Sequence, residues 1–235
     1  MKYILYFILI PALLPVFIIL RYVYILDKNE REPLGFILKV VLWGAIFSIP
    51  CAAVERFMFT LLGSYYEPGT IKFAWMQNTV GVALVEEFSK WLVFMILVWK
   101  NKNFDYRYDG IVYAVSASLG FAALENILYV ISYGTGVSIG RAIFAIPGHA
   151  TFGVFMGYWL SRGKTFWLDN KRFRMKICKL FALGIPMLIH GCYDFLLSEQ
   201  VAALGYQYVF FIYVLLLDLF AWRVIKHEFR TDRML

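Results

Sequence analysis

Residues able to ionise or exchange protons lie inside the apolar stretches of this chain, at Glu86, Glu87, Lys90, Glu125, His149, His190 and Asp194. The two adjacent glutamates and the lysine fall within the stretch LVEEFSKW, residues 84–91. Each charged side chain near the centre of a membrane helix costs about 2.5–3.5 kcal/mol on insertion scales. Such groups normally face the interior of a helix bundle and mark a functional site. We therefore interpret this set as one site.

Carboxylates and imidazoles of this kind suit the hydrolysis of an amide bond. The reaction needs an activated water, a group that stabilises the oxyanion, and a proton donor for the leaving amine. Burial favours the neutral form of a carboxylic acid, which lets it act as a base or an acid near neutral pH. A histidine one helical turn from a carboxylate, as His190 is from Asp194, is oriented and stabilised as a proton donor.

The same residues could instead hold a zinc ion. Two histidines and a carboxylate with an open fourth position suit catalytic Zn²⁺, and a glutamate then serves as general base. The possible ligands are His149 and His190 with one of Glu87, Glu125 or Asp194. These ligands would come from different helices, so their spacing does not separate a centre without a cofactor from one with a single Zn²⁺.

The composition predicts that these residues sit in a membrane protein. The chain has 235 residues, of which 61% are hydrophobic and 17% charged, whereas a soluble domain has about 25% charged residues. Its apolar runs are long enough to cross about 30 Å of hydrocarbon. We expect an all-α, polytopic bundle, with residues 1–235 forming one integral membrane domain whose core spans about 27–197. The net charge is +7, and the basic residues lie in short loops between apolar segments, where they act as signals for membrane topology. We therefore expect a lipid bilayer as partner and no binding of nucleic acid.

About seven spans are expected, and the loops between them predict their direction. The expected spans are Tyr3–Tyr24, Leu34–Val54, Ala74–Val98, Gly110–Ser132, Ile139–Leu160, Ile177–Leu197 and Tyr206–Val224. Lys and Arg concentrate in the connections near 21–31, 100–107 and 162–179 and in the tail 223–233. Because cytoplasmic loops carry the excess of basic residues, we expect the N-terminus outside and the C-terminus in the cytoplasm. The loop from Glu55 to Phe73 is then expected outside.

In that orientation the ionisable residues agree in depth. At about 1.5 Å per residue, Glu86 lies about 18 Å from the outer end of its helix, Glu125 about 10 Å and His149 about 15 Å. His190 and Asp194 lie about 5–10 Å down. Four helices would thus deliver acids and imidazoles to the outer half of the membrane, which scattered structural residues would not need to do.

Helical spacing predicts which neighbours share a face. Glu86 and Lys90 are four residues apart and could form an ion pair. Glu86 and Glu87 point about 100° apart, so only one of them can aim directly into a cavity. Asn126, beside Glu125, is expected to support the site, either as an interhelical hydrogen-bond donor or as a catalytic group.

Several motifs together resemble those of the PrsW family of bacterial intramembrane proteases. They are NEREP (29–33), EExxK (86–90), the segment YDGIVYAVSASLGFAALENILY (108–129), the GHA turn with His149, and HGCYDF (190–195). The family is similar to a wider CAAX-protease and bacteriocin-processing group with signatures EExxR, FxxxH and HxxxN/D. Here the first two read EExxK and FxxxE, the latter from Phe121 to Glu125.

This resemblance implies a multi-pass enzyme of the bacterial cell membrane and a role for each motif. Glu86 would be the base that activates water and Glu87 its neighbour, while His149 and His190 would be transition-state or metal partners. Asp194 would orient a partner or donate a proton. The implied reaction is the first, extracytoplasmic-side cut in a single-span anti-sigma factor, which leads to release of a stress sigma factor.

Two other functions use similar residues. Chains of Glu, Asp and His also relay protons in ion-coupled transporters, but those usually show internal repeats and interrupted helices with midplane sites. A non-catalytic membrane scaffold could use the same residues for packing. Loss of substrate cleavage on Glu86→Gln, with the fold intact, would separate a protease from both.

Overall fold

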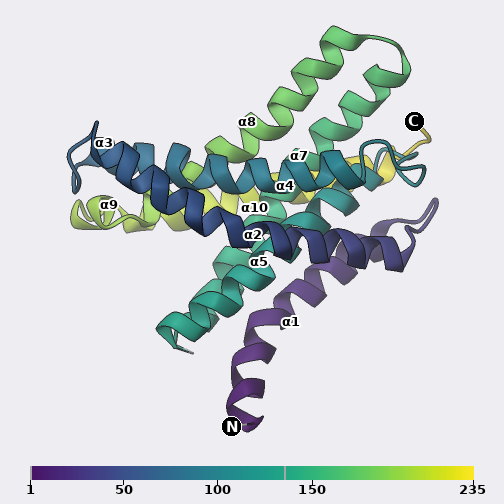
Figure 1. Cartoon of the computed structure of the whole chain (residues 1–235). Coiled ribbons are helices and arrows are strands. Elements are labelled where there is room, and N and C mark those ends of the chain that lie inside the picture. Colours follow the sequence, from purple (N-terminus) through teal and green to yellow (C-terminus); the bar gives the residue numbers. More distant parts are fainter. Residues whose placement is uncertain (1, 135) are drawn as a thin grey trace.

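The computed structural model describes residues 2–134 and 136–235, except for the side chains of residues 2–9, 11, 12 and 138. The start of the expected span Tyr3–Tyr24 therefore falls outside the described side chains. Throughout the described part of the chain the regular elements are helices, which confirms the all-α prediction. The long helices are α1 (Lys2–Leu26), α2 (Leu34–Gly63), α4 (Leu84–Leu97), α5 (Asp109–Tyr133), α7 (Ile146–Leu168), α8 (Arg172–Leu197) and α10 (Gln207–Arg230) (Figure 1).

Short helical segments precede two of the long helices, α4 and α7. The three short α-helices are α3 (Ile71–Met76), α6 (Gly136–Gly140) and α9 (Glu199–Ala203). A π-helical segment, Gln77–Ala83, joins α3 to α4, and a second, Arg141–Ala145, joins α6 to α7. Single π-helical turns inside longer helices occur frequently at functional sites.

Within the described residues, five helical segments are long and apolar enough to cross a membrane. They are α2, α5, residues 141–168, α8 and α10. The expected third span falls short because α4 carries three charged residues, Glu86, Glu87 and Lys90. The described apolar part of α1 is the shorter stretch Leu13–Leu26. Multi-pass membrane insertion follows from the five, while the count of seven and the direction of insertion stay predictions.

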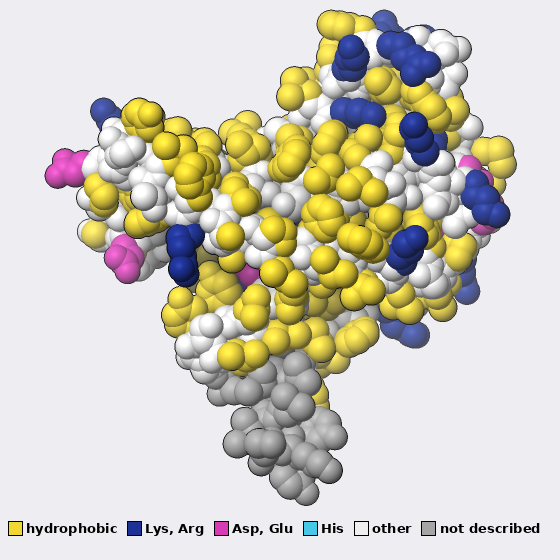
Figure 2. All heavy atoms as spheres, in the orientation of Figure 1, with side chains coloured by type: hydrophobic (Ala, Val, Ile, Leu, Met, Phe, Trp, Pro, Cys, Tyr) yellow, Lys and Arg dark blue, Asp and Glu magenta, His cyan; other side chains and the backbone are white. Residues whose placement is uncertain are grey.

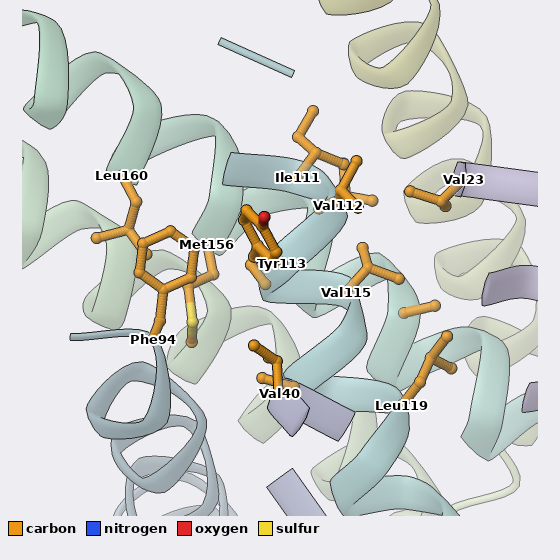
Figure 3. Packing of buried hydrophobic residues seen from close by; sticks show 14 of the residues in the cluster. Val23, Val40, Phe94, Ile111, Val112, Tyr113, Val115, Leu119, Met156 and Leu160 are labelled. Atoms are coloured by element: carbon orange, nitrogen blue, oxygen red, sulfur yellow. The ribbon is translucent and has the colours of Figure 1, made fainter. Parts of the chain in front are cut away.

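Helix α5 lies at the centre of the bundle. In its most apolar window 72% of the residues are buried, against 17% in that of α10, so α5 faces protein while α10 leaves most of its surface for lipid. Helices α1, α2, α4 and α7 pack around it. Figure 3 shows their side chains converging on α5, with Val23 from α1, Val40 from α2, Phe94 from α4 and Met156 from α7.

Glycines allow the backbones around α5 to approach closely. A Cβ added at Gly120 would collide with the backbone of Val41 in α2, and one added at Gly44 would collide with the backbone of Ala117. Small residues let membrane helices pack closely. Contacts of this kind fix the position of α5 against α2, and α5 carries Glu125.

The C-terminal end of α2 differs from the expectation. The sequence predicts a span that ends at Val54 and a loop that begins at Glu55, but α2 continues to Gly63. Glu55 and Arg56 therefore lie on the helix, where both line a cavity described below. The sequence predicts that the charges of Glu55 and Arg56 mark the end of the helix. In the structure the helix continues past them, because both side chains face that cavity.

The two ends of the bundle differ in charge. The α1–α2 connection, the α4–α5 connection and the C-terminus lie together at one end, and α3 and α9 lie at the other (Figure 1). In Figure 2 hydrophobic side chains cover most of the visible face, and Lys and Arg gather toward the end with the C-terminus and toward the α7–α8 turn. The positive-inside rule predicts a cytoplasmic location for that end, and the direction of insertion stays a prediction.

The glycine contact between α5 and α2 can be tested with a pair of variants. Alanine is intrinsically better than glycine inside a helix by about 1 kcal/mol, but overpacking a tight contact costs about 1–3 kcal/mol. We expect Gly120→Ala to lower the thermal unfolding midpoint of the detergent-solubilised protein. Gly184→Ala, in α8 where nothing lies within 4 Å of the added carbon, should leave it unchanged or raise it. Equal effects at both positions would contradict the close packing of α5 on α2.

Candidate active site

Four helices bring the ionisable residues of the sequence together. Helix α4 carries Glu86, Glu87 and Lys90, α5 carries Glu125, α7 carries His149, and α8 carries His190 and Asp194. The first turns of α4 and α7 each follow a π-helical segment directly. At Gly191 an added Cβ would meet Thr79 of the first π-helical segment, so the glycine lets α8 approach closely beside His190.

The ammonium group of Lys90 is the hub of the site. Its Nζ lies 3.1 Å from Glu86 Oε2, 2.7 Å from Glu87 Oε1 and 2.8 Å from His149 Nδ1. An ammonium has three protons and no acceptor, so these three partners use its full donor capacity. Lys90 is fully buried and its Nζ also stands over the ring of Phe121, 4.6 Å from the centroid. One cation thus compensates the charge of two buried carboxylates.

The contacts of His149 define its tautomer. Because Lys90 can only donate, Nδ1 of His149 accepts, which makes the ring neutral with its proton on Nε2. Nε2 lies 3.0 Å from Glu125 Oε2, to which it donates. The same Glu125 oxygen lies 3.0 Å from Nη2 of Arg141. His149 therefore joins the Lys90 hub to a second ion pair on α5.

His190 sits between two carboxylates. Its Nδ1 lies 3.0 Å from Glu87 Oε1 and its Nε2 lies 3.2 Å from Asp194 Oδ2. Donation from both nitrogens to ionised carboxylates makes the ring an imidazolium. The ring of Phe152 stacks on it at a centroid distance of 4.6 Å, which fixes its plane.

These groups border a cavity of about 880 Å³. Its lining includes Glu86, Glu125, His149, His190 and Asp194, together with apolar residues of α2, α5, α7 and α8. Glu87 and Lys90 do not line it and lie behind Glu86, fully buried. The volume falls within the range of ligand pockets, about 300–1,000 Å³. Of the two adjacent glutamates, Glu86 is the one that can reach a bound molecule.

The structure brings together the ionisable residues that the sequence singled out, and it shows further contacts of Lys90 and Asn126. Lys90 was expected to pair with Glu86, and it also binds Glu87 and His149. Asn126, fully buried beside Glu125, accepts at Oδ1 from Nε of Arg141 at 2.9 Å. Asn126 thus contacts the site through Arg141 and does not line the cavity.

Arg141 and Glu55 line the cavity but were not among the predicted site residues. Arg141 falls near the start of the expected span Ile139–Leu160, and it bonds Glu125 and Asn126 and stacks on Tyr129, with its guanidinium carbon 3.9 Å from the ring centroid. Glu55 was placed in a loop and lines the cavity from α2. An Arg and a Glu adjoining apolar stretches were the available signals, and both were taken as span ends.

The residues in this arrangement do not fit a catalytic zinc ion. One ligand atom each from Glu86, Glu87 and His149 lies within 4.8 Å of the others, but Lys90 Nζ bonds all three. The ring nitrogens of His149 are taken by Lys90 and Glu125. Those of His190 face two carboxylates. The ammonium occupies the place that an ion would need, so no step below is routed through a metal.

Comparison with known proteins identifies the family. The model described as "PrsW family intramembrane metalloprotease" matches residues 32–218. A protein named Protease PrsW from Oceanobacillus iheyensis is 37% identical over 191 residues, covering 81% of this chain and 83% of the relative. Proteins of the same name from Bacillus subtilis (32% identical, covering 83% of this chain and 85% of the relative) and Clostridioides difficile (34%, 80% and 78%) are also similar.

No solved structure matches the chain. The family model covers most of the chain, and so do the named relatives. Together with helices suited to a bilayer, these matches support a peptidase embedded in the bacterial membrane. This chain belongs to the PrsW family of intramembrane metalloproteases.

Proposed function

We propose that this protein cleaves a peptide bond of a single-span membrane protein with a water molecule activated by Glu86. The observation that carries the proposal is that Glu86, His149, His190 and Asp194 border one cavity. Glu86 is held from behind by Lys90 through Oε2, which leaves its second oxygen, Oε1, for a water.

In the proposed reaction Glu86 takes a proton from water as the hydroxide oxygen attacks the carbonyl carbon of the scissile bond. The imidazolium of His190, on the cavity wall, stabilises the negative charge that develops on the carbonyl oxygen. Glu86 then returns its proton to the leaving nitrogen as the carbon–nitrogen bond breaks, giving a carboxylic acid and an amine, and the acid's proton passes to the amine to leave a carboxylate and an ammonium. Asp194 and Glu87 hold His190 in its charged, oriented state.

The remaining residues position these groups. His149 connects Lys90 to Glu125, and Arg141 balances the charge of Glu125. The role proposed for Lys90 is to supply the positive charge that stabilises the buried carboxylates of Glu86 and Glu87. The family's description as metalloproteases implies an ion, and Lys90 supplies that charge in this arrangement.

The location of the cavity suggests on which side of the membrane the cut occurs. Residues at its border include Glu55 near the end of α2, Tyr133 at the end of α5, and Ser198 between α8 and α9. These lie at the end of the bundle away from the basic loops and the C-terminus. By the positive-inside rule that end is extracytoplasmic, which supports an N-out, C-in orientation. We propose the first, extracytoplasmic-side cut in a membrane-tethered anti-sigma factor as the reaction.

Substitution of the proposed base gives the most direct test of the reaction. Glu86→Gln keeps the size of the side chain and removes its ability to accept a proton, so cleavage of a tagged single-span anti-sigma factor should fall by about 10²–10⁴-fold. The readout is the cleaved fragment on an immunoblot, with the thermal unfolding midpoint measured in parallel. Glu67→Gln, on an exposed loop, makes the same chemical change and should cleave at the wild-type rate. Persistent cleavage by a folded Glu86→Gln protein would reject the assignment.

The hub role of Lys90 is tested by stability. Lys90→Met leaves the carboxylates of Glu86 and Glu87 buried without their cation, and loss of one partner of a buried pair costs about 3–5 kcal/mol. We expect a clear drop in the unfolding midpoint and loss of cleavage. Adding Glu87→Gln to Lys90→Met should recover part of the stability, because one uncompensated charge is removed.

Lys39→Met serves as the control for this pair of variants, because Lys39 is exposed on α2 and its loss should change little. If Lys90→Met were as stable as Lys39→Met, the ammonium would not be holding the carboxylates.

A further inference from the structure

A second group of buried acids lies at the end of the bundle away from the cavity. Asp27 directly follows α1, Glu32 precedes α2, and Asp109 begins α5. They are 1%, 3% and 0% exposed, and one oxygen from each lies within 4.8 Å of the other two. Glu32 belongs to the stretch NEREP and Asp109 to YDGIVY, two motifs that the proposed active site does not use.

The surrounding protein forms hydrogen bonds with only some of these carboxylate oxygens. Asp109 Oδ2 accepts from the backbone N–H groups of Asp105 and Tyr106, at 3.0 and 2.6 Å. The hydroxyl of Tyr113 donates to Glu32 Oε2. Both carboxylate oxygens of Asp27, and Oδ1 of Asp109, are buried without a hydrogen bond of normal geometry.

No basic side chain of the described residues comes close enough to these acids to form an ion pair. None of the ion pairs formed by the described residues includes Asp27, Glu32 or Asp109. Burial raises the pKa of Asp27 to about 7, an effect that the nearby backbone N–H of Glu32 and the charge of Arg31 oppose in part. Burial likewise raises the pKa of Glu32 to about 7. Buried carboxylates normally find a partner, so the group needs protons or a cation.

We propose that Asp27, Glu32 and Asp109 bind a hard divalent cation of the Mg²⁺ or Ca²⁺ class. All three offer oxygen ligands, which these cations prefer, and no histidine or cysteine takes part, as a site for zinc or copper would favour. Ca²⁺ bonds oxygen at about 2.3–2.6 Å, so its ligands lie up to about 5 Å apart, which the observed spacing satisfies. Mg²⁺, with bonds of about 2.0–2.1 Å, requires the same oxygens to move slightly closer.

The bound ion would tie three parts of the chain together. It would join the end of α1 and the α1–α2 connection to the first turn of α5. The C-terminal tail already contacts the same region, since Asp232 accepts from Asn29 Nδ2 at 2.9 Å and from the backbone N–H of Tyr108 at 3.0 Å. Figure 1 shows these connections at one end of the bundle. The proposal is independent of the reaction proposed for the cavity.

The test is the response of the full-length, detergent-solubilised protein to cations after chelation and dialysis. We expect Mg²⁺ or Ca²⁺ to raise the thermal unfolding midpoint in a saturable way, by about 5 °C at saturation. Asp27→Asn and Asp109→Asn should remove this rise. Glu30→Gln, an exposed acid of the same connection, should keep it. Separate Mg²⁺ and Ca²⁺ titrations identify the ion that binds more tightly.

Direct binding completes the experiment. Radioactive Ca²⁺, or Mn²⁺ followed by electron paramagnetic resonance, should show about one ion per wild-type chain that is lost in Asp27→Asn. If Asp109→Asn does not fold, Glu32→Gln takes its place. The proposal is overturned if neither cation shifts the midpoint and Asp27→Asn is at least as stable as wild type, because the acids are then held by protons. It is also overturned if Asp27→Asn keeps the full cation response, because the ion then binds elsewhere.

Discussion

A buried ammonium group and the carboxylates around it determine how the active-site end of this bundle is built. Two adjacent glutamates in an apolar helix would each carry a large desolvation cost, and removing both from water is tolerated only where a cation and further hydrogen bonds answer them. Lys90 pairs with Glu86 and Glu87, which lie four and three residues before it in the same helix. Its ammonium also reaches across to His149 on α7. One side chain therefore links α4 to α7.

The same interaction separates the roles of the two glutamates. Glu87 is enclosed by Lys90 and His190 and serves the structure of the site, whereas Glu86 borders the cavity. The helical rotation of about 100° between neighbours makes that division unavoidable once one of them faces the cavity. A pair of adjacent acids can thus supply one reactive group and one fixed charge.

The sequence predicted the helical class, the set of ionisable residues and several of their pairings, because periodicity and i, i+4 spacing are local properties. The π-helical segments before α4 and α7 were not predicted, since the sequence carries no composition signal for them. Glu55 was assigned to a loop and Arg141 to the end of a span, because a charge next to an apolar run looks the same whether it ends the span or faces a cavity. Asp109 lies close to Asp27 and Glu32 although about 80 positions separate it from both of them, which one sequence cannot reveal.

The central claim is that Glu86 activates water with Lys90, and not a metal ion, supplying the nearby positive charge. The decisive measurement is cleavage of a purified single-span substrate by the full-length enzyme after treatment with a transition-metal chelator in excess Mg²⁺ and Ca²⁺, with the zinc content of the same sample determined. The account predicts unchanged cleavage at far less than one zinc per chain. About one zinc per chain, loss of cleavage on its removal and recovery on its return would contradict it.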